Sequence, residues 1–200
     1  MPQVLISGPT VSLRYATPAD APRLFELGSD PAVTQWFSWG PYSVEGEATA
    51  YIRSLETRRE SGELLEFLIE HRDDGVIGIT GLSELAARDR RATVGTWLGR
   101  AWWGSGANAE SKALVAHLAF TACGLDRLTA WANARNGRSA AALERLGFVR
   151  EGVLRGWHRH GDERHDALVF RMDRRDWAAS PLAAVEVAIE GEPPTVWRVG

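Results

Sequence analysis

A short loop with two glycines constrains this chain more than any other feature. The segment Trp103-Gly104-Ser105-Gly106-Ala107-Asn108 connects a predicted strand that ends near Gly99 to a predicted helix that begins near Ala107. Two glycines two residues apart let the backbone turn sharply and leave its N–H groups uncovered. Because these groups converge with the positive end of a helix, the loop is suited to an anion such as a phosphate. The pattern also fits an ordinary tight turn, and it is neither a Walker loop nor the three-glycine dinucleotide fingerprint.

The hydrophobic periodicity on both sides of the loop predicts a mixed α/β domain. Strand patterns are found at Val11–Tyr15, Leu64–His71, Val76–Leu82, Ala92–Leu98, Leu128–Ala134 and Ala167–Met172. Helical patterns begin after Thr17 and Ser43, and two more cover Ala107–Cys123 and Ser139–Leu146. The turn Asp73-Asp74-Gly75 makes the second and third strands a hairpin, and one long helix follows the central strand.

Composition excludes several classes of protein. Two hundred residues suffice for one domain, and the single cysteine, Cys123, excludes an intrachain disulfide or a Cys-rich metal cluster. A net charge of −3 argues against a nucleic-acid partner. We find no secretory signal pattern and no run of eighteen apolar residues, so we expect no membrane span and a cytoplasmic protein.

Further motifs accompany the loop in a fixed order. They are Trp97-Leu98-Gly99, Glu110, Asn136-Gly137-Arg138-Ser139 and Leu143-Glu144-Arg145-Leu146-Gly147-Phe148. Together they resemble the GNAT superfamily of acyl-CoA-dependent N-acyltransferases, above all its ribosomal-protein-alanine acetyltransferase (RimJ/RimL-like) branch. The likeness spans roughly residues 11–177. We therefore expect one GNAT domain over residues 1–177 and a tail over 178–200.

The resemblance implies a mixed, mostly antiparallel sheet with splayed central strands flanked by helices. It also implies acetyl-CoA as acyl donor. Its pyrophosphate would lie on the loop amides, namely those of Gly104, Ser105, Gly106, Ala107 and Asn108. The pantetheine arm would pair with the exposed backbone of Trp97, Leu98 and Gly99 like an added strand. Asn136 would hydrogen-bond that arm and Ser139 would lie near the sulfur, although both residues also suit a helix start.

Three departures from the family pattern affect detailed roles. Ala101 stands where the superfamily usually has Gln or Arg, and Thr93 stands where the branch often has Glu on the central strand. Many relatives protonate the leaving thiolate with a tyrosine that follows the short helix. Every tyrosine of this chain precedes the glycine loop. Ser139 is therefore our candidate for the acid.

Acyl transfer also needs a base for the amine and a donor for the carbonyl oxygen. A backbone N–H near Leu98 is the candidate donor. The segment Gly156–Asp166, expected to be a loop, contains His158, His160 and His165, and His158 is the candidate base. The alternative is a solvated histidine-rich turn, with Glu84 as the next candidate base. These histidines lack the spacing of a metal site, so no metal is expected.

The acceptor amine is expected between the first two helices and the segment before the last strand. Trp36, Phe37, Trp39 and Trp157 are candidate walls of its pocket, which suits an apolar amine or a cationic head group, whether a small molecule or a protein N-terminus. Arg138 keeps transfer of another acyl group, such as succinyl, open. The departures also leave open an inactive CoA-binding sensor. In the tail, the alternation Ala184–Ile189 would add an edge strand or pair across a homodimer, and Val196-Trp197 is a further short strand pattern.

Overall fold

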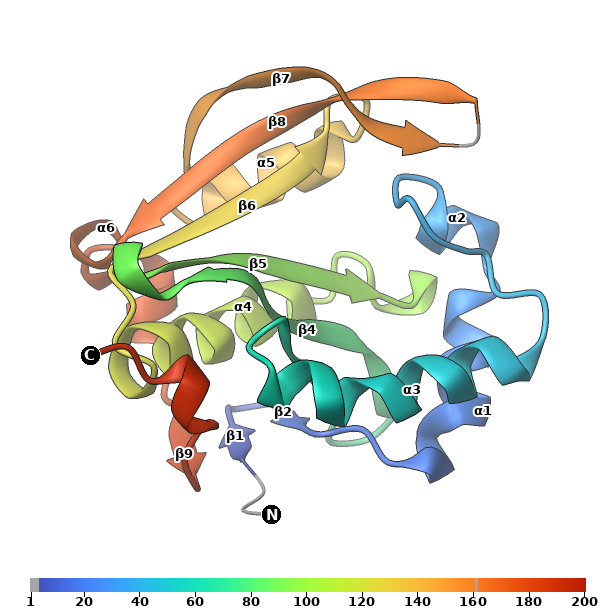
Figure 1. Cartoon of the computed structure of the whole chain (residues 1–200), viewed down its shortest axis with the longest axis horizontal. Helices are drawn as coiled ribbons and strands as arrows, with labels where there is room; N and C mark the ends of the chain where they lie inside the picture. The colour runs from blue at the N-terminus through green and yellow to red at the C-terminus, as the bar shows by residue number, and fades with distance from the viewer. Residues whose placement is uncertain (1–3, 161) are drawn as a thin grey trace.

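The computed structural model describes residues 4–160 and 162–200 and arranges them around one twisted sheet with helices on both faces (Figure 1). The strands are β1 Leu5–Ser7, β2 Val11–Arg14, β3 Leu64–His71, β4 Gly75–Ala86, β5 Arg91–Leu98, β6 Arg127–Asn133, β7 Val149–His160, β8 Glu163–Asp173 and β9 Ala188–Glu190. Their order in the sheet is β7-β8-β6-β5-β4-β3-β2-β1-β9. Among the described strands, only β5 and β6 pair in parallel. The predicted mixed, mostly antiparallel sheet is thus confirmed.

The helices follow the capping chemistry of the sequence. They are α1 Ala21–Gly28, α2 Pro31–Thr34, α3 Glu45–Glu60, α4 Ala107–His117, α5 Gly137–Arg145 and α6 Arg174–Ala178. Before α1, the Asp20 carboxylate accepts hydrogen bonds from the Thr17 N–H and hydroxyl group, which fixes the chain entry. Ser43 does not cap α3 directly. Its N–H donates to Glu47, and the helix begins two residues later. A π-helical turn, Leu118–Ala122, extends α4 before Gly124 ends it at a φ of 73°.

Two apolar clusters lie on opposite faces of the sheet. The larger one packs α4 against the strands through fully buried side chains such as Phe67, Leu114 and Phe170. The smaller one packs α1 and α3 on the other face through Leu24, Ile52 and other aliphatic residues. Burial of such side chains stabilises the fold by about 1.5–3 kcal/mol each. The larger cluster continues past the point where β5 and β6 stop pairing, through Val94, Leu98 and Ala132.

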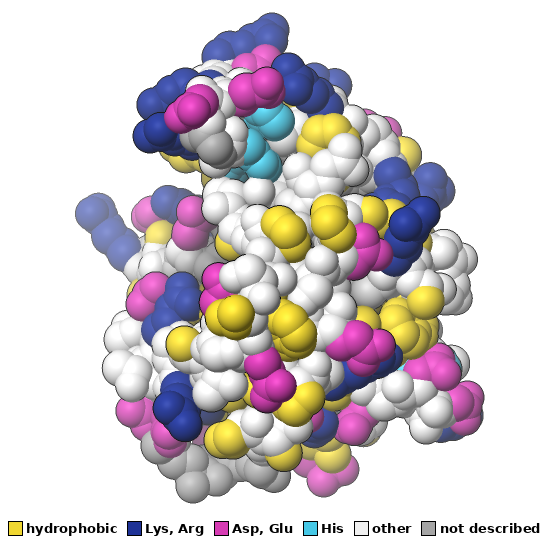
Figure 2. Space-filling view, turned by 90° about the vertical axis from the view of Figure 1, so that its right-hand side faces the viewer, with side chains coloured by type: hydrophobic (Ala, Val, Ile, Leu, Met, Phe, Trp, Pro, Cys, Tyr) yellow, Lys and Arg dark blue, Asp and Glu magenta, His cyan; other side chains and the backbone are white. Residues whose placement is uncertain are grey.

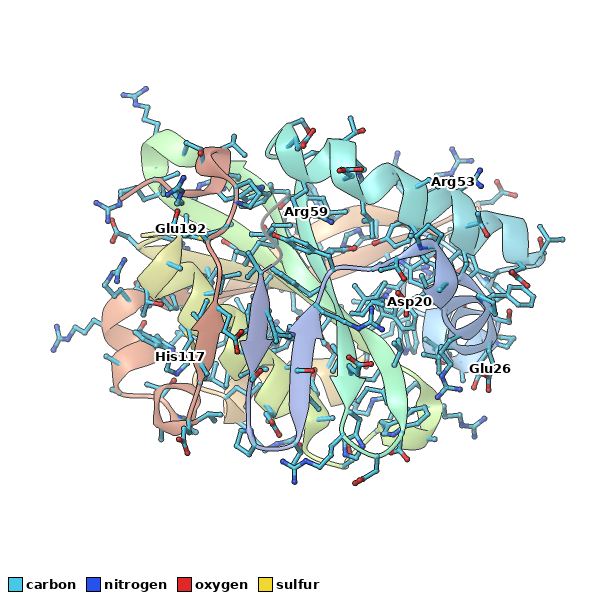
Figure 3. All side chains as sticks on the ribbon, turned by 90° about the horizontal axis from the view of Figure 1, so that it is seen from below. Asp20, Glu26, Arg53, Arg59, His117 and Glu192 are labelled. Carbon is cyan, nitrogen blue, oxygen red and sulfur yellow. The ribbon has the colours of Figure 1, made fainter. Side chains whose placement is uncertain are left out.

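The C-terminal tail packs onto the domain. The strand β9 lies at the sheet edge, antiparallel to β1, and Trp197 is completely buried. The indole N–H of Trp197 donates to the carbonyl of Arg59 at 3.0 Å, and Figure 3 shows Arg59 near the end of α3. The predicted strand at Val196-Trp197 is wrong. A 3₁₀ turn, Thr195–Trp197, begins there because two prolines precede it and cannot donate to a strand ladder. The homodimer stays a prediction.

The histidine-rich segment differs most from its predicted structure. Residues predicted as a loop belong to the long β7–β8 hairpin, and Gly161 alone of that segment lies outside the described residues. The pattern was obscured because β7 has irregular register in two places and contains Gly156 at a φ of 57°. The short elements β1, α2 and α6 were not predicted either. None of the helices in the described residues is long and apolar enough to cross a membrane.

Candidate active site

The two-glycine loop opens directly onto the start of α4. Gly104 and Gly106 have φ angles of 82° and 96°, and a Cβ added at either position would meet no atom within 4 Å. Gly106 is the N-cap of α4. The amides of Ser105 and Ala107 are engaged inside the turn, with Trp102 and with the Ser105 hydroxyl group respectively. Gly104, Gly106 and Asn108 are therefore the loop residues best placed to meet a bound anion.

Strands β5 and β6 pair only at their beginnings. Their register covers Arg91 to Thr93 of β5, and β5 then continues to Leu98 without its neighbour (Figure 1). The N–H of Gly99 donates to Ile77 of β4 at 2.8 Å. Because successive N–H groups of a strand point to opposite edges, the N–H of Leu98 points toward the open edge. The N–H of Gly99 is used within the protein and its carbonyl accepts from the Trp102 N–H at 3.0 Å, so only the second lone pair of that carbonyl is left for a ligand, and Gly99 stays a prediction.

A cavity of about 640 Å³ occupies the space between the separated strands. The predicted site residues that line it are Trp36, Phe37, Trp97, Leu98, Gly104, Gly106, Asn108, Asn136, Ser139, Trp157 and His158. Ala107 belongs to the buried core instead. Trp39 stands behind the wall, with its ring 5.4 Å from Phe37 and 5.5 Å from Trp97. The loop, the open edge of β5 and the candidate catalytic groups thus share one cavity.

The beginning of α5 forms one side of this cavity. The Asn136 side-chain oxygen accepts a hydrogen bond from the Ser139 N–H at 3.1 Å and caps the helix. The amide nitrogen of Asn136 is then directed elsewhere, so capping and ligand binding are compatible. The Arg138 guanidinium lies over the Trp103 ring at 3.4 Å, and burial lowers its pKa. This places a cation beside the glycine loop.

His158 and Glu84 form the opposite side of the cavity. Burial lowers the pKa of His158, Glu84 opposes that shift, and His165 adds to it. His158 is therefore neutral near pH 7 and able to accept a proton. Glu84 has a φ of 51° and sits where the β4–β5 register shifts, and its carboxylate accepts a hydrogen bond from the Thr93 hydroxyl group at 2.6 Å.

The other histidines of the hairpin form a stack beside the cavity. His165 is buried, contacts Asn133 at 2.8 Å and Glu163 at 3.1 Å, and stacks on His160 at 4.5 Å. Figure 2 shows histidine side chains gathered beneath the charged tip of the hairpin. Among the described residues, no group of three or more His, Cys, Asp or Glu side chains is arranged to hold a metal ion.

The structure adds two residues that the sequence analysis did not place in the site. Trp131 of β6 stacks on Trp157 with ring centres 5.6 Å apart and nearly parallel planes. Lys112 of α4 also lines the cavity, one helical turn after Asn108. The four-residue spacing from Asn108 was the available signal for Lys112. No such signal exists for Trp131, because an aromatic residue in a strand most often belongs to the hydrophobic core.

Comparison with known proteins identifies relatives that are named acetyltransferases. The family model of the acetyltransferase (GNAT) domain matches residues 10–149. The uncharacterized N-acetyltransferase p20 of Bacillus licheniformis is 29% identical over 169 residues, which cover 84% of this chain and 95% of p20. The "Putative ribosomal N-acetyltransferase YdaF" of Bacillus subtilis is 28% identical over 174 residues, which cover 84% and 93%. The crystal structure of the self-immunity acetyltransferase MccE with acetyl-CoA and AMP shares the fold at a TM-score of 0.74 and 18% identity, covering 82% of this chain and 92% of MccE.

Proposed function

Since this chain belongs to the GNAT acetyltransferase family and is an N-acetyltransferase, we propose that it moves the acetyl group of acetyl-CoA to a primary amine. One observation carries the proposal. The glycine loop at the start of α4, the open edge of β5 and a neutral histidine all face a single cavity. An acyl-CoA needs a phosphate site and an extended slot, and the amine needs a base.

The residues present fit acetyl-CoA. Gly104 and Gly106 leave open space above the amides at the positive end of α4, which suits the pyrophosphate. The open edge of β5 would receive the pantetheine arm, and the Leu98 N–H would donate to the thioester oxygen. Acetyl-CoA supplies the activated acyl group, and the protein supplies orientation and proton transfer.

Direct attack by the amine is the mechanism that this chain favours. Cys123, the chain's only cysteine, is completely buried and burial raises the pKa of its thiol to about 12, so it is poorly suited to carry an acyl group. We assign His158 as the base that takes a proton from the amine. Ser139, at the first turn of α5, is assigned as the donor to the departing thiolate.

The acceptor binds among the aromatic residues of the segment after α2 and of β7. Trp36, Phe37 and Trp157 line this end of the cavity, and Glu84 adds a negative charge. A cationic amine with an apolar neighbour matches these walls. The similarity to YdaF supports a protein N-terminus of the ribosomal type as the acceptor, and a small amine is the alternative.

The test is thiol release from acetyl-CoA with a panel of N-terminal peptides and small amines. We expect release that depends on the amine, with a rate that saturates in acetyl-CoA. Succinyl-CoA in the same assay tests the second acyl group, which Arg138 favours because it brings a cation to the cavity wall. Tight acetyl-CoA binding without release by any amine would instead support a CoA sensor.

A further inference from the structure

Lys112 is the chain's only lysine among 23 basic residues. It lies on α4, is 7% exposed, and lines the cavity together with Thr96, Trp97 and Ser139. The proposed acyl transfer to an external amine does not use the amine of Lys112. A charged side chain at such a position is costly unless it is paired.

The polar contacts of Lys112 are made with hydroxyl groups. Its Nζ donates to the Thr96 hydroxyl oxygen at 2.8 Å, and that oxygen lies 2.7 Å from the hydroxyl oxygen of Thr80. Thr80 donates in turn to the Gly95 carbonyl at 3.0 Å, so Thr96 must donate to Thr80. This chain of donors uses one N–H of the amine and leaves the lone pair of a neutral amine unused.

No carboxylate of residues 4–160 and 162–200 forms an ion pair with Lys112, and burial lowers the pKa of its amine to about 8. At pH 8 about half of the amine is then unprotonated, compared with less than about 1% for an unfolded lysine of pKa 10.4. Lys112 therefore has a nucleophilic population that an exposed lysine lacks.

The position of the amine relative to β5 is equally important. Thr96 lies in the part of β5 beyond Thr93, where β6 has separated and the strand edge is open. Its hydroxyl group holds the Lys112 amine in the cavity that Trp97 and Leu98 also line, where the backbone of β5 would receive the acyl end of the donor. The amine thus reaches the cavity from α4, whereas the aromatic acceptor walls Trp36 and Phe37 come from the segment after α2.

We propose that Lys112 is itself an acetyl acceptor, modified by acetyl-CoA bound in this cavity. The Nζ lone pair forms a bond to the thioester carbonyl carbon, and the carbon–sulfur bond breaks. The proton lost by the amine passes to the departing thiolate, giving Nε-acetyl-lysine and free CoA. This inference rests on the proposed use of acetyl-CoA.

The experiment is mass spectrometry of the whole protein after incubation with acetyl-CoA at pH 8. Cleavage after arginine yields the peptide 101–127, in which Lys112 supplies the only side-chain amine, so a gain of one acetyl group on that peptide identifies the site. We expect acetylation at least about tenfold faster in the folded chain than in the urea-unfolded chain, as the difference in free amine requires. Desulfo-CoA, which has no thioester, should block it by competition.

Lys112→Met is the matched variant, because it keeps a long apolar stem without an amine. It should leave peptide 101–127 unmodified. Equal rates in folded and unfolded wild-type protein, or no acetylation of Lys112 while an added amine is acetylated, would overturn this inference and leave the proposed function standing. Absence of acetyl-CoA binding in calorimetry would overturn both.

Discussion

A substitution at Gly106 is the sharpest test of the proposed cofactor site, because its effect on folding stability can be distinguished from its effect on acetyl-CoA binding. A Cβ at this position meets no atom within 4 Å, so Gly106→Ala introduces no clash in the free protein. The remaining cost is the φ of 96°, which an alanine adopts at about 1–2 kcal/mol. For a chain of this size the melting temperature should fall by about 2–8 °C. The variant should therefore remain folded.

In Gly106→Ala, acetyl-CoA binding should be strongly weakened, because the added methyl group occupies space that the pyrophosphate must enter. We expect a loss of at least about tenfold, or about 1.4 kcal/mol, in isothermal calorimetry. Gly75→Ala is the matched control, since Gly75 has a φ of 68° and equally open surroundings but lies at the β3–β4 turn, away from the cavity. The control should lose similar stability and keep its affinity. A folded Gly106→Ala variant with wild-type affinity would show that the loop does not bind the cofactor.

Other variants test the catalytic and structural assignments. Ser139→Ala should lower kcat in the thiol-release assay without weakening acetyl-CoA binding, because protonation of the thiolate occurs in the transition state. His158→Ala should slow the reaction by about 10²–10⁴-fold near neutral pH and recover at high pH, where the amine loses its proton unaided, so a wild-type pH profile would remove His158 from the mechanism. Glu84→Gln removes the charge that raises the pKa of His158, so the acidic limb of the pH–rate profile should move to lower pH, and an unmoved limb would contradict the coupling. Trp197→Ala should cost about 3–5 kcal/mol in urea unfolding, whereas Trp157→Ala, at an exposed site, should cost far less.

The parts of the fold that the sequence predicted are those specified by local patterns. The β3–β4 hairpin follows from two apolar runs around Gly75, and α4 follows from apolar spacing after the glycine loop. The glycine loop at the start of α4 was predictable for the same reason, because its glycines and the helix start are adjacent in the chain. The strand β7 was not, because its register irregularities and Gly156 interrupt the alternation.

The parts of the site that could not be predicted depend on contacts between distant segments. Lys112 was visible as the single lysine, but its burial against Thr96 depends on how α4 packs on β5. The aromatic pair of Trp131 and Trp157 depends on the long hairpin that was read as a loop. The use of the Gly99 N–H by β4 could not be predicted either, because a motif does not say which of its backbone groups the neighbouring strand already bonds.

The position of Glu84 bears on one departure from the family pattern, the threonine at position 93. Thr93 stands where the branch often has a glutamate, and its presence alone suggests a missing catalytic carboxylate. A carboxylate nevertheless lies beside Thr93. It belongs to Glu84 of the neighbouring strand β4 and accepts a hydrogen bond from the Thr93 hydroxyl group at 2.6 Å. The register shift of β4 and the left-handed backbone at Glu84 direct the side chain toward β5, and such strained residues cluster at functional sites. Glu84 also raises the pKa of His158 and lines the same cavity, so its carboxylate would support the proposed base. Thr93 at this position is therefore compatible with the proposed acyl transfer, because Glu84 supplies a carboxylate beside it.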